Sequence, residues 1–157
     1  MIADLEAARK PDLQGTIEWG WAHQRVPHRT ADIFFVVSIR NLGMPSSIEA
    51  WSLDVKTARR YGEGVSGIRP QRIPGSLTFE DLCIFSSDDL FSRTEAMRTG
   101  IVERGIVYFL TDKVIPESIE GAQFILTYKD VSGREYATPP YSLPRNKVVI
   151  RSQELNP

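Results

Sequence analysis

The sequence predicts an all-β protein, an antiparallel β-sandwich with almost no helix. The main observation is the stretch 32–43, DIFFVVSIRNLG, whose alternate residues place four apolar side chains on one face of a strand: Ile33, Phe35, Val37 and Ile39. Phe34 and Val36 make the opposite face apolar as well, which indicates a central strand. Further short segments with period-two alternation, separated by Gly, Pro and Asn turn residues, are typical of a sandwich.

Length and composition fit one ordinary globular domain. The chain has 157 residues, 41% of them hydrophobic and 25% charged, with a formal net charge of -1. This balance argues against nucleic acid, which is bound mainly through phosphate charge. The single cysteine, Cys83, excludes an intrachain disulfide, and its apolar neighbours predict a small buried side chain. No segment resembles a signal peptide or membrane helix, so we expect a soluble chain, while its native compartment and any preceding anchor stay open.

We expect a flexible lead-in over residues 1–12 and a first strand over 13–21. Leu13 and Ile17 share one face of this strand with Trp19 and Trp21. Residues 22–30, which contain two histidines, are predicted to connect it to the central strand. The central strand ends in the turn 41–43, and the strand 48–55 then places Trp51 between two sheets as a core residue.

Residues 56–75, which we call the ribbon, are rich in glycine, proline and arginine and predict a hairpin or irregular edge segment. The ribbon has Glu63 as its only acidic residue against five basic ones: Lys56, Arg59, Arg60, Arg69 and Arg72. The next stretch, 76–95, is acidic. The two stretches either pair with each other within the fold or present a dipolar surface to a partner.

The remaining elements are a strand within 77–85, a helix over 90–98 capped by residues 87–89, and strands over 101–110, 122–129 and 134–138. The turn 130–133 closes a hairpin, and residues 148–150 offer a last edge strand. About seven strands with one short helix favour an immunoglobulin-like β-sandwich over a β-barrel. The predicted domain therefore covers residues 13–150, with a tail over 151–157.

Several of these segments resemble those of one family. They are SIRNLGMPS (38–46), WSLDV (51–55), GIVERGIVYF (100–109) and FILTYKDVSGREY (124–136). Together they are similar to bacterial extracytoplasmic immunoglobulin-like domains of unknown function, which show an Asn-x-Gly turn and a terminal Asp-x-x-Gly hairpin at comparable places. The resemblance implies the sandwich fold, a location outside the cytoplasm and a membrane tether outside the given chain. It supplies no catalytic residues.

Candidate chemical sites find little support in the sequence. The segment 62–67 matches G-x-G-x-x-G, but Pro70 follows where a dinucleotide site needs a helix. His23 and His28 lack a third metal ligand at a suitable spacing and are predicted to be solvated loop residues. Neither Ser66 nor Ser132 lies in a nucleophile turn. The paired Asp88 and Asp89 are explained as helix caps. We therefore expect no cofactor, no metal and no catalysis.

The sequence favours a non-catalytic interaction domain that binds a protein partner through an edge strand or through the ribbon. The residues predicted to contact the partner are Arg59, Arg60, Tyr61, Arg69 and Arg72. The alternative is a carbohydrate-binding module with exposed aromatic rings, drawn from Trp19, Trp21, Trp51 and Tyr61. An enzyme is the third reading. The partner and the oligomeric state stay open.

Overall fold

The computed structural model describes residues 10–26, 30–56, 64–73, 75–79, 82–90, 95–112, 121–144 and 148–152. The structure of these residues is almost entirely β. The strands are β1 (Leu13–Val26), β2 (Thr30–Asn41), β3 (Glu49–Lys56), β4 (Val65–Ile68), β5 (Ser76–Phe79), β6 (Leu82–Phe85), β7 (Val102–Thr111), β8 (Gln123–Lys129), β9 (Glu135–Ala137), β10 (Tyr141–Ser142) and β11 (Val148–Ser152). One 3₁₀ turn, η2 (Ser86–Asp88), follows β6. Within the described residues, no helix has the length and apolar character needed to cross a membrane.

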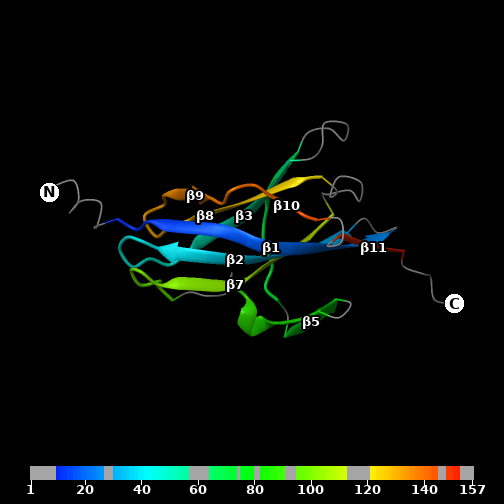
Figure 1. Cartoon of the computed structure of the whole chain (residues 1–157), viewed down its shortest axis with the longest axis horizontal. Helices are drawn as coiled ribbons and strands as arrows, with labels where there is room; N and C mark the ends of the chain where they lie inside the picture. The colour runs from blue at the N-terminus through cyan, green and yellow to red at the C-terminus, as the bar shows by residue number, and fades with distance from the viewer. Residues whose placement is uncertain are drawn as a thin grey trace.

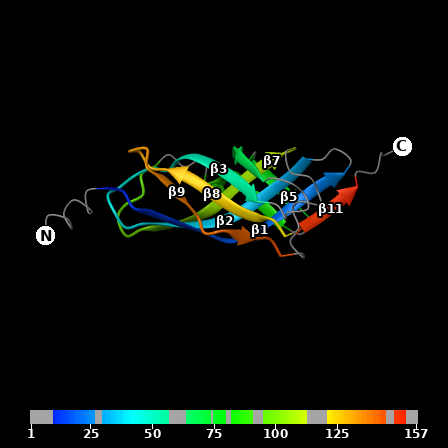
Figure 2. The ribbon, with the colours of Figure 1, turned by 90° about the horizontal axis from the view of Figure 1, so that it is seen from above.

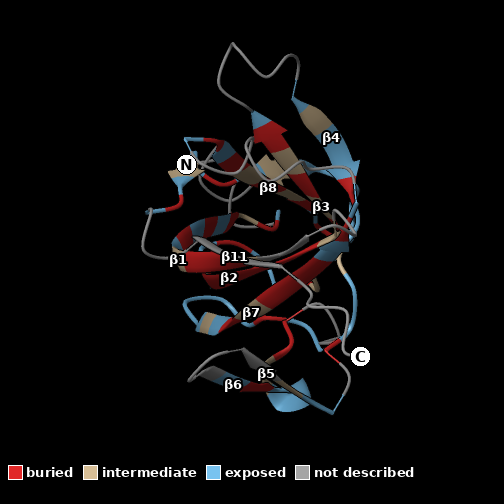
Figure 3. Cartoon of the chain, turned by 90° about the vertical axis from the view of Figure 1, so that its right-hand side faces the viewer, coloured by how far each residue is buried: buried red, intermediate tan, exposed pale blue. Residues whose placement is uncertain are grey.

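The strands form two main sheets and a separate hairpin (Figure 1). One sheet has the order β11-β1-β2-β7, and the other has the order β10-β8-β3-β4 with β9 also paired to β8. Seen from above, β3 and β8 lie over β1 and β2 (Figure 2). The hairpin β5-β6 lies beyond the opposite face of the first sheet (Figure 3). The predicted all-β sandwich is confirmed, although β11 joins β1 in parallel, which the sequence pattern did not indicate.

The main core lies between the two sheets and is organised around β2. Ile33, Phe35, Val37 and Ile39 are all fully buried and belong to one apolar cluster with Trp51, Leu53, Phe124 and Leu126 of the facing sheet. Hydrogen-bonded neighbours on both sides, β1 and β7, make β2 the predicted central strand. Trp51 is also the core residue that the sequence predicts.

A second, smaller core covers the outer face of the first sheet. Phe34, Val36, Trp21 and Tyr108 of that sheet pack with Ile73 and with Ile84 of the β5-β6 hairpin. Because side chains alternate along β6, Ile84 points to the sheet while its neighbour Cys83 is exposed. The prediction that Cys83 is buried is therefore wrong. Its apolar neighbour Ile84 lies on the buried face of the hairpin, and Cys83 lies on the opposite, exposed face.

A β-bulge at Glu18 divides β1 into two halves whose corresponding side chains point to opposite faces of the sheet. The register shifts between Ile17 and Trp19, so Leu13 and Ile17 face the main core, whereas Trp19 and Trp21 face the outer one. One extra residue reverses a period-two alternation. The prediction that all these side chains share one face is therefore wrong after Glu18.

The predicted helix over residues 90–98 is not found in the described part of that segment. The N–H of Leu90 donates to the carbonyl of Ile106 in β7 at 2.8 Å, and the N–H of Met97 donates to the carbonyl of Ser46 at 2.8 Å. Leu90 and Met97 are also buried in the main core. Long-range backbone pairing therefore replaces local helix formation at both ends of the segment. Residues 91–94 lie outside the described residues.

The predicted hairpin turn after β8 is held by the buried carboxylate of Asp130. Its Oδ1 accepts hydrogen bonds from the backbone N–H of Ser132 at 2.8 Å and of Arg134 at 3.1 Å, and its Oδ2 accepts the hydroxyl of Tyr136 at 2.7 Å. Burial alone would raise the pKa of Asp130. The hydrogen bonds from Ser132, Tyr136 and Arg134 together outweigh burial and lower this pKa below its ordinary value.

This arrangement predicts acid sensitivity. Because the pKa of Asp130 is lower in the folded chain, the ionised carboxylate stabilises the fold above the unfolded-state pKa of about 4, and this contribution is lost as the pH falls through the folded pKa. We expect Asp130→Asn to lower the free energy of unfolding by about 2 kcal/mol at pH 7. Urea unfolding at pH 7 and pH 3 should show the difference between the two proteins shrinking at the lower pH. An unchanged difference would contradict the assignment.

Candidate interaction surface

Apart from Lys56, Gly64 and Gly75, the described part of the ribbon consists of β4 and the strap, which is our name for residues 69–73. Ile68 at the end of β4 is buried in the main core, and Ile73 is buried in the outer core. Between them the strap passes the edge of β7, where the N–H of Gln71 donates to the carbonyl of Tyr108 at 2.9 Å. The N–H of Ile73 donates to Oδ2 of the buried Asp89 at 3.1 Å. The strap is thus anchored at both ends.

The strap presents two arginine side chains to solvent. Arg69 and Arg72 are exposed, and neither forms an ion pair within the part of the chain that the structure describes. The backbone positions of both arginines are fixed, because Ile68 and Ile73 are buried on either side of them. Neither arginine therefore pairs with the described acidic residues of the stretch 76–95, and both stay available at the surface that these residues form.

Strand β4 lies at the edge of its sheet, where it pairs with β3 and, among the described residues, with no other strand (Figure 3). Leu53 pairs with Ile68 and Val55 with Val65, so Ser66 and Gly67 together stand opposite Asp54 alone. Gly67 has a φ of 76°, which favours glycine, and its N–H donates to Oδ1 of Asp54 at 3.1 Å. The bulge bends a short edge strand whose Ser66 and Gly67 are exposed.

An open hollow of about 490 Å³ adjoins this edge. It is lined by Gly67, Ile68, Arg69 and Gln71 of the ribbon and by Thr30, Leu110, Thr111 and Asp112 of the ends of β2 and β7. Arg69 contributes a cation and the exposed Asp112 a carboxylate, and Leu110, which is 38% exposed, contributes apolar surface. The hollow therefore combines apolar area with charges of both signs beside an available strand edge, which suits a bound side chain.

The structure places two of the five predicted contact residues, Arg69 and Arg72, on this surface. The other three, Arg59, Arg60 and Tyr61, lie outside the described residues. Thr30, Leu110 and Asp112 belong to the same hollow but were not predicted. They come from the ends of two strands far away in the sequence, and no local pattern marks them.

The segment 62–67 does not have the structural context of a dinucleotide site. Its described residues, from Gly64 onward, lead into strand β4 and then Pro70, where such a site needs a helix N-terminus. Gly64 instead permits close backbone packing, since a Cβ there would lie 2.2 Å from the carbonyl oxygen of Val55. Ser132 donates its hydroxyl to Asp130, while Ser66 is an exposed residue of β4.

The histidine and aspartate candidates occupy structural positions. The prediction that His23 is a loop residue is wrong, because His23 lies in β1. Its Nδ1 is 3.8 Å from Oδ2 of the buried Asp32. His28 lies outside the described residues. Among those described, no group of three His, Cys, Asp or Glu side chains is arranged to hold a metal ion. Asp88 caps η2 by accepting the N–H of Phe85 at 3.0 Å, and does not cap the predicted helix.

The comparisons with known proteins do not assign a family. No protein family model matches the chain, and no curated protein sequence is similar to it. Among solved structures, a Bordetella pertussis protein designated ApaA aligns over 88% of this chain and 98% of its own, with 11% identity and a TM-score of 0.39. A structural genomics target, SoR45, aligns over 90% of each chain with 12% identity and a TM-score of 0.40. These values indicate only a weak resemblance in fold.

Proposed function

We propose that the chain is a non-catalytic interaction domain that binds an acidic, extended segment of a protein partner along β4 and the strap. The observation that carries this proposal is the exposure of Arg69 and Arg72 on a backbone anchored by Ile68 and Ile73. An anchored surface loses little conformational entropy when it binds. The two predicted routes to a partner, an edge strand and a basic ribbon, coincide here because β4 belongs to the ribbon.

The same proposal includes an immunoglobulin-like domain type and a location outside the cytoplasm, for which the support is the sequence resemblance. Nucleic acid is not the proposed partner, because the chain carries 20 acidic against 19 basic residues and a formal net charge of -1. A bound segment would add backbone hydrogen bonds at the outer edge of β4, and acidic side chains would meet the arginines. The hollow beside Arg69 would receive one side chain of that segment.

Carbohydrate binding by several exposed rings, the alternative from the sequence, is less well supported. Trp21 and Trp51 are 7% and 4% exposed, so neither offers an open ring face. Trp19 is half-buried, and Tyr61 lies outside the described residues.

Selection from a displayed library of random peptides tests the proposed function. We expect the protein to enrich peptides rich in Asp and Glu, with affinities that fall as salt is added. The double variant Arg69→Glu/Arg72→Glu should weaken the selected peptides about 10-fold or more, a loss of about 1.4 kcal/mol. The affinity can be measured by fluorescence anisotropy.

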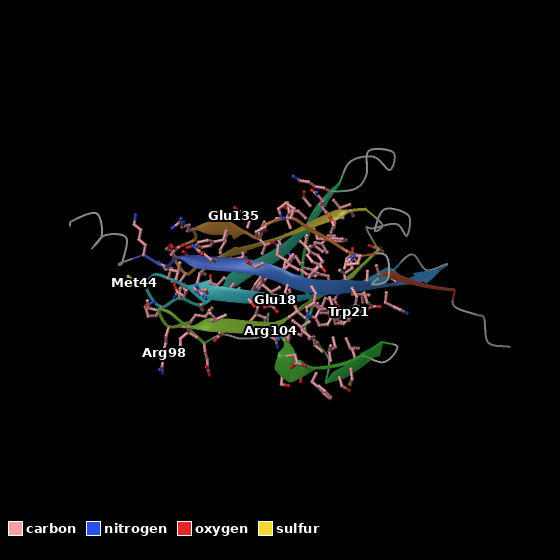
Figure 4. The ribbon with its side chains drawn as sticks, viewed as in Figure 1. Glu18, Trp21, Met44, Arg98, Arg104 and Glu135 are labelled. Atoms are coloured by element: carbon pink, nitrogen blue, oxygen red, sulfur yellow. The ribbon has the colours of Figure 1, made fainter. Side chains whose placement is uncertain are left out.

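Arg98→Glu is the matched control. Arg98 is exposed near the end of the sandwich where β2 finishes, whereas Arg69 adjoins Thr30, where β2 begins (Figure 4). The same charge reversal at Arg98 should therefore leave the peptide affinities within about twofold. Selected peptides without acidic residues, or equal losses in both variants, would contradict the proposal.

A further inference from the structure

A second hollow, of about 300 Å³, lies on the outer face of the first sheet beside the β5-β6 hairpin. Its wall includes residues of very different chemistry, namely Trp19, Trp21, Asp88, Arg104 and the exposed Cys83. These residues come from β1, η2, β7 and β6, so the fold brings together side chains that are far apart in the sequence. The volume is at the lower end of the range for small-molecule sites, about 300 to 1,000 Å³.

The aromatic wall is part of an ordered stack. The rings of Trp19 and Trp21 stack at 4.8 Å between centroids, and Trp21 stacks in turn on Phe34 at 4.9 Å. Phe34 continues the stack to Tyr108 at 4.7 Å. Because Trp21 and Phe34 are buried, they hold the half-buried Trp19 in place at the hollow. A rigid aromatic side chain offers apolar contact area at little entropic cost.

The polar groups of the hollow have mixed charge. The Nε of Arg104 donates to Oε2 of Glu18, so the guanidinium is positioned while its terminal N–H groups can serve a ligand (Figure 4). The carboxylate of Asp88 uses Oδ2 for the Phe85 N–H and has a second oxygen that can accept a hydrogen bond. A cation, a carboxylate and an aromatic ring therefore line one small space.

The geometry points to a binding site for a neutral sugar ring, a hexopyranose, in this hollow. The apolar face of the sugar would pack on the Trp19 ring, and neighbouring hydroxyls would accept from Arg104 and donate to Asp88. Glu18 pairs with Arg104, so Asp88 leaves one negative charge at the hollow, which would repel a ligand of net negative charge. This site is separate from the protein-binding surface of β4 and the strap, so either can fail without the other.

Titration of ¹⁵N-labelled protein with D-glucose, D-galactose, D-mannose and N-acetylglucosamine tests the site. We expect at least one of these sugars to shift the indole N–H resonances of Trp19 and Trp21 in a saturable way in the millimolar range. Trp51 is an internal control, because it packs on Tyr128 in the main core. The same sugar should slow alkylation of Cys83, the single cysteine of the chain, which lines the hollow.

A charged analogue and variants complete the test. Glucuronate, whose carboxylate would face Asp88, should bind more weakly than the neutral sugar. Trp19→Ala should weaken binding about 10-fold. Arg104→Gln, at a side chain that is 61% exposed and so tolerant of exchange, should weaken it several-fold, whereas Arg98→Gln should not. The site is overturned if no neutral sugar gives a saturable shift, if glucuronate binds as well as the neutral sugar, or if the Arg104 and Arg98 variants bind equally.

Discussion

Phe35→Ala should lower the free energy of unfolding by about 3–5 kcal/mol. Phe35 is fully buried on the central strand β2, and its ring lies 5.4 Å from that of Phe124 in the opposite sheet. It also meets Phe109 edge-on at 6.2 Å and Tyr141 at 6.3 Å. Truncation would leave a cavity between two sheets whose backbones are fixed by hydrogen bonding, so little collapse can occur. The loss is a large part of the roughly 5–15 kcal/mol of an ordinary domain.

Urea unfolding followed by circular dichroism measures this effect. The matched control is Phe85→Ala, the same exchange at a side chain that is 52% exposed, for which we expect a change within about 0.5 kcal/mol. The denaturation midpoint should fall for the Phe35 variant with an unchanged slope. Similar midpoints for the two variants would show that Phe35 does not hold the sheets together.

The central strand could be predicted because its consecutive residues are apolar on both faces, which indicates burial on both faces. No bulge interrupts β2, so alternation places Phe35 on one face and Phe34 on the other, and both faces are covered. The turn after β8 was predictable for the same reason: Asp130, Ser132 and Gly133 form it through hydrogen bonds that are local in the sequence. Local chemistry decides local structure where no distant contact competes with it.

The face of the sheet on which Trp19 and Trp21 lie could not be predicted, because it depends on interactions with residues far away in the sequence. The bulged Glu18 is held by the hydroxyl of Ser38, which donates to its Oε1 at 2.6 Å from 20 residues away. Arg104, 86 residues away, donates to its Oε2. The hydrogen bond from Ser38 and the nearby Arg104 lower the pKa of Glu18 against the opposing effect of burial. Nothing near Glu18 in the sequence marks these partners.

The candidate surface was predictable in part. Charge composition is a local property, so the basic ribbon and its Arg69 and Arg72 stand out in the sequence. Whether those charges are paired or exposed depends on the path of the chain across the edge of β7, which Gln71 and Ile73 fix through long-range hydrogen bonds. The hydrogen bond from the Ile73 N–H also gives the buried Asp89 a partner in the strap, which its position before the predicted helix did not indicate.

Asn41→Leu should lower the free energy of unfolding by about 2–4 kcal/mol, although the side chain keeps its branched shape. Asn41 is fully buried where β2 ends. Its Nδ2 donates to the carbonyls of Met44 at 2.7 Å and Met97 at 3.0 Å, and its Oδ1 accepts the N–H of Gly43 at 2.9 Å. An apolar side chain of similar shape would leave these backbone groups without a partner, and the unpaired groups carry the cost.

The turn around Asn41 has no room to supply new partners. A Cβ at Gly43 would lie 2.0 Å from the carbonyl oxygen of Lys10, so the first described residues pack directly against the turn. Leu42→Ala, at the neighbouring side chain that is 48% exposed, is the control and should change the stability by less than about 0.5 kcal/mol. Hydrogen exchange separates this cause from a general loss of packing. In the Asn41 variant the Gly43 amide should lose more protection than the amides of β8, whereas a uniform loss would contradict the role of the side-chain amide.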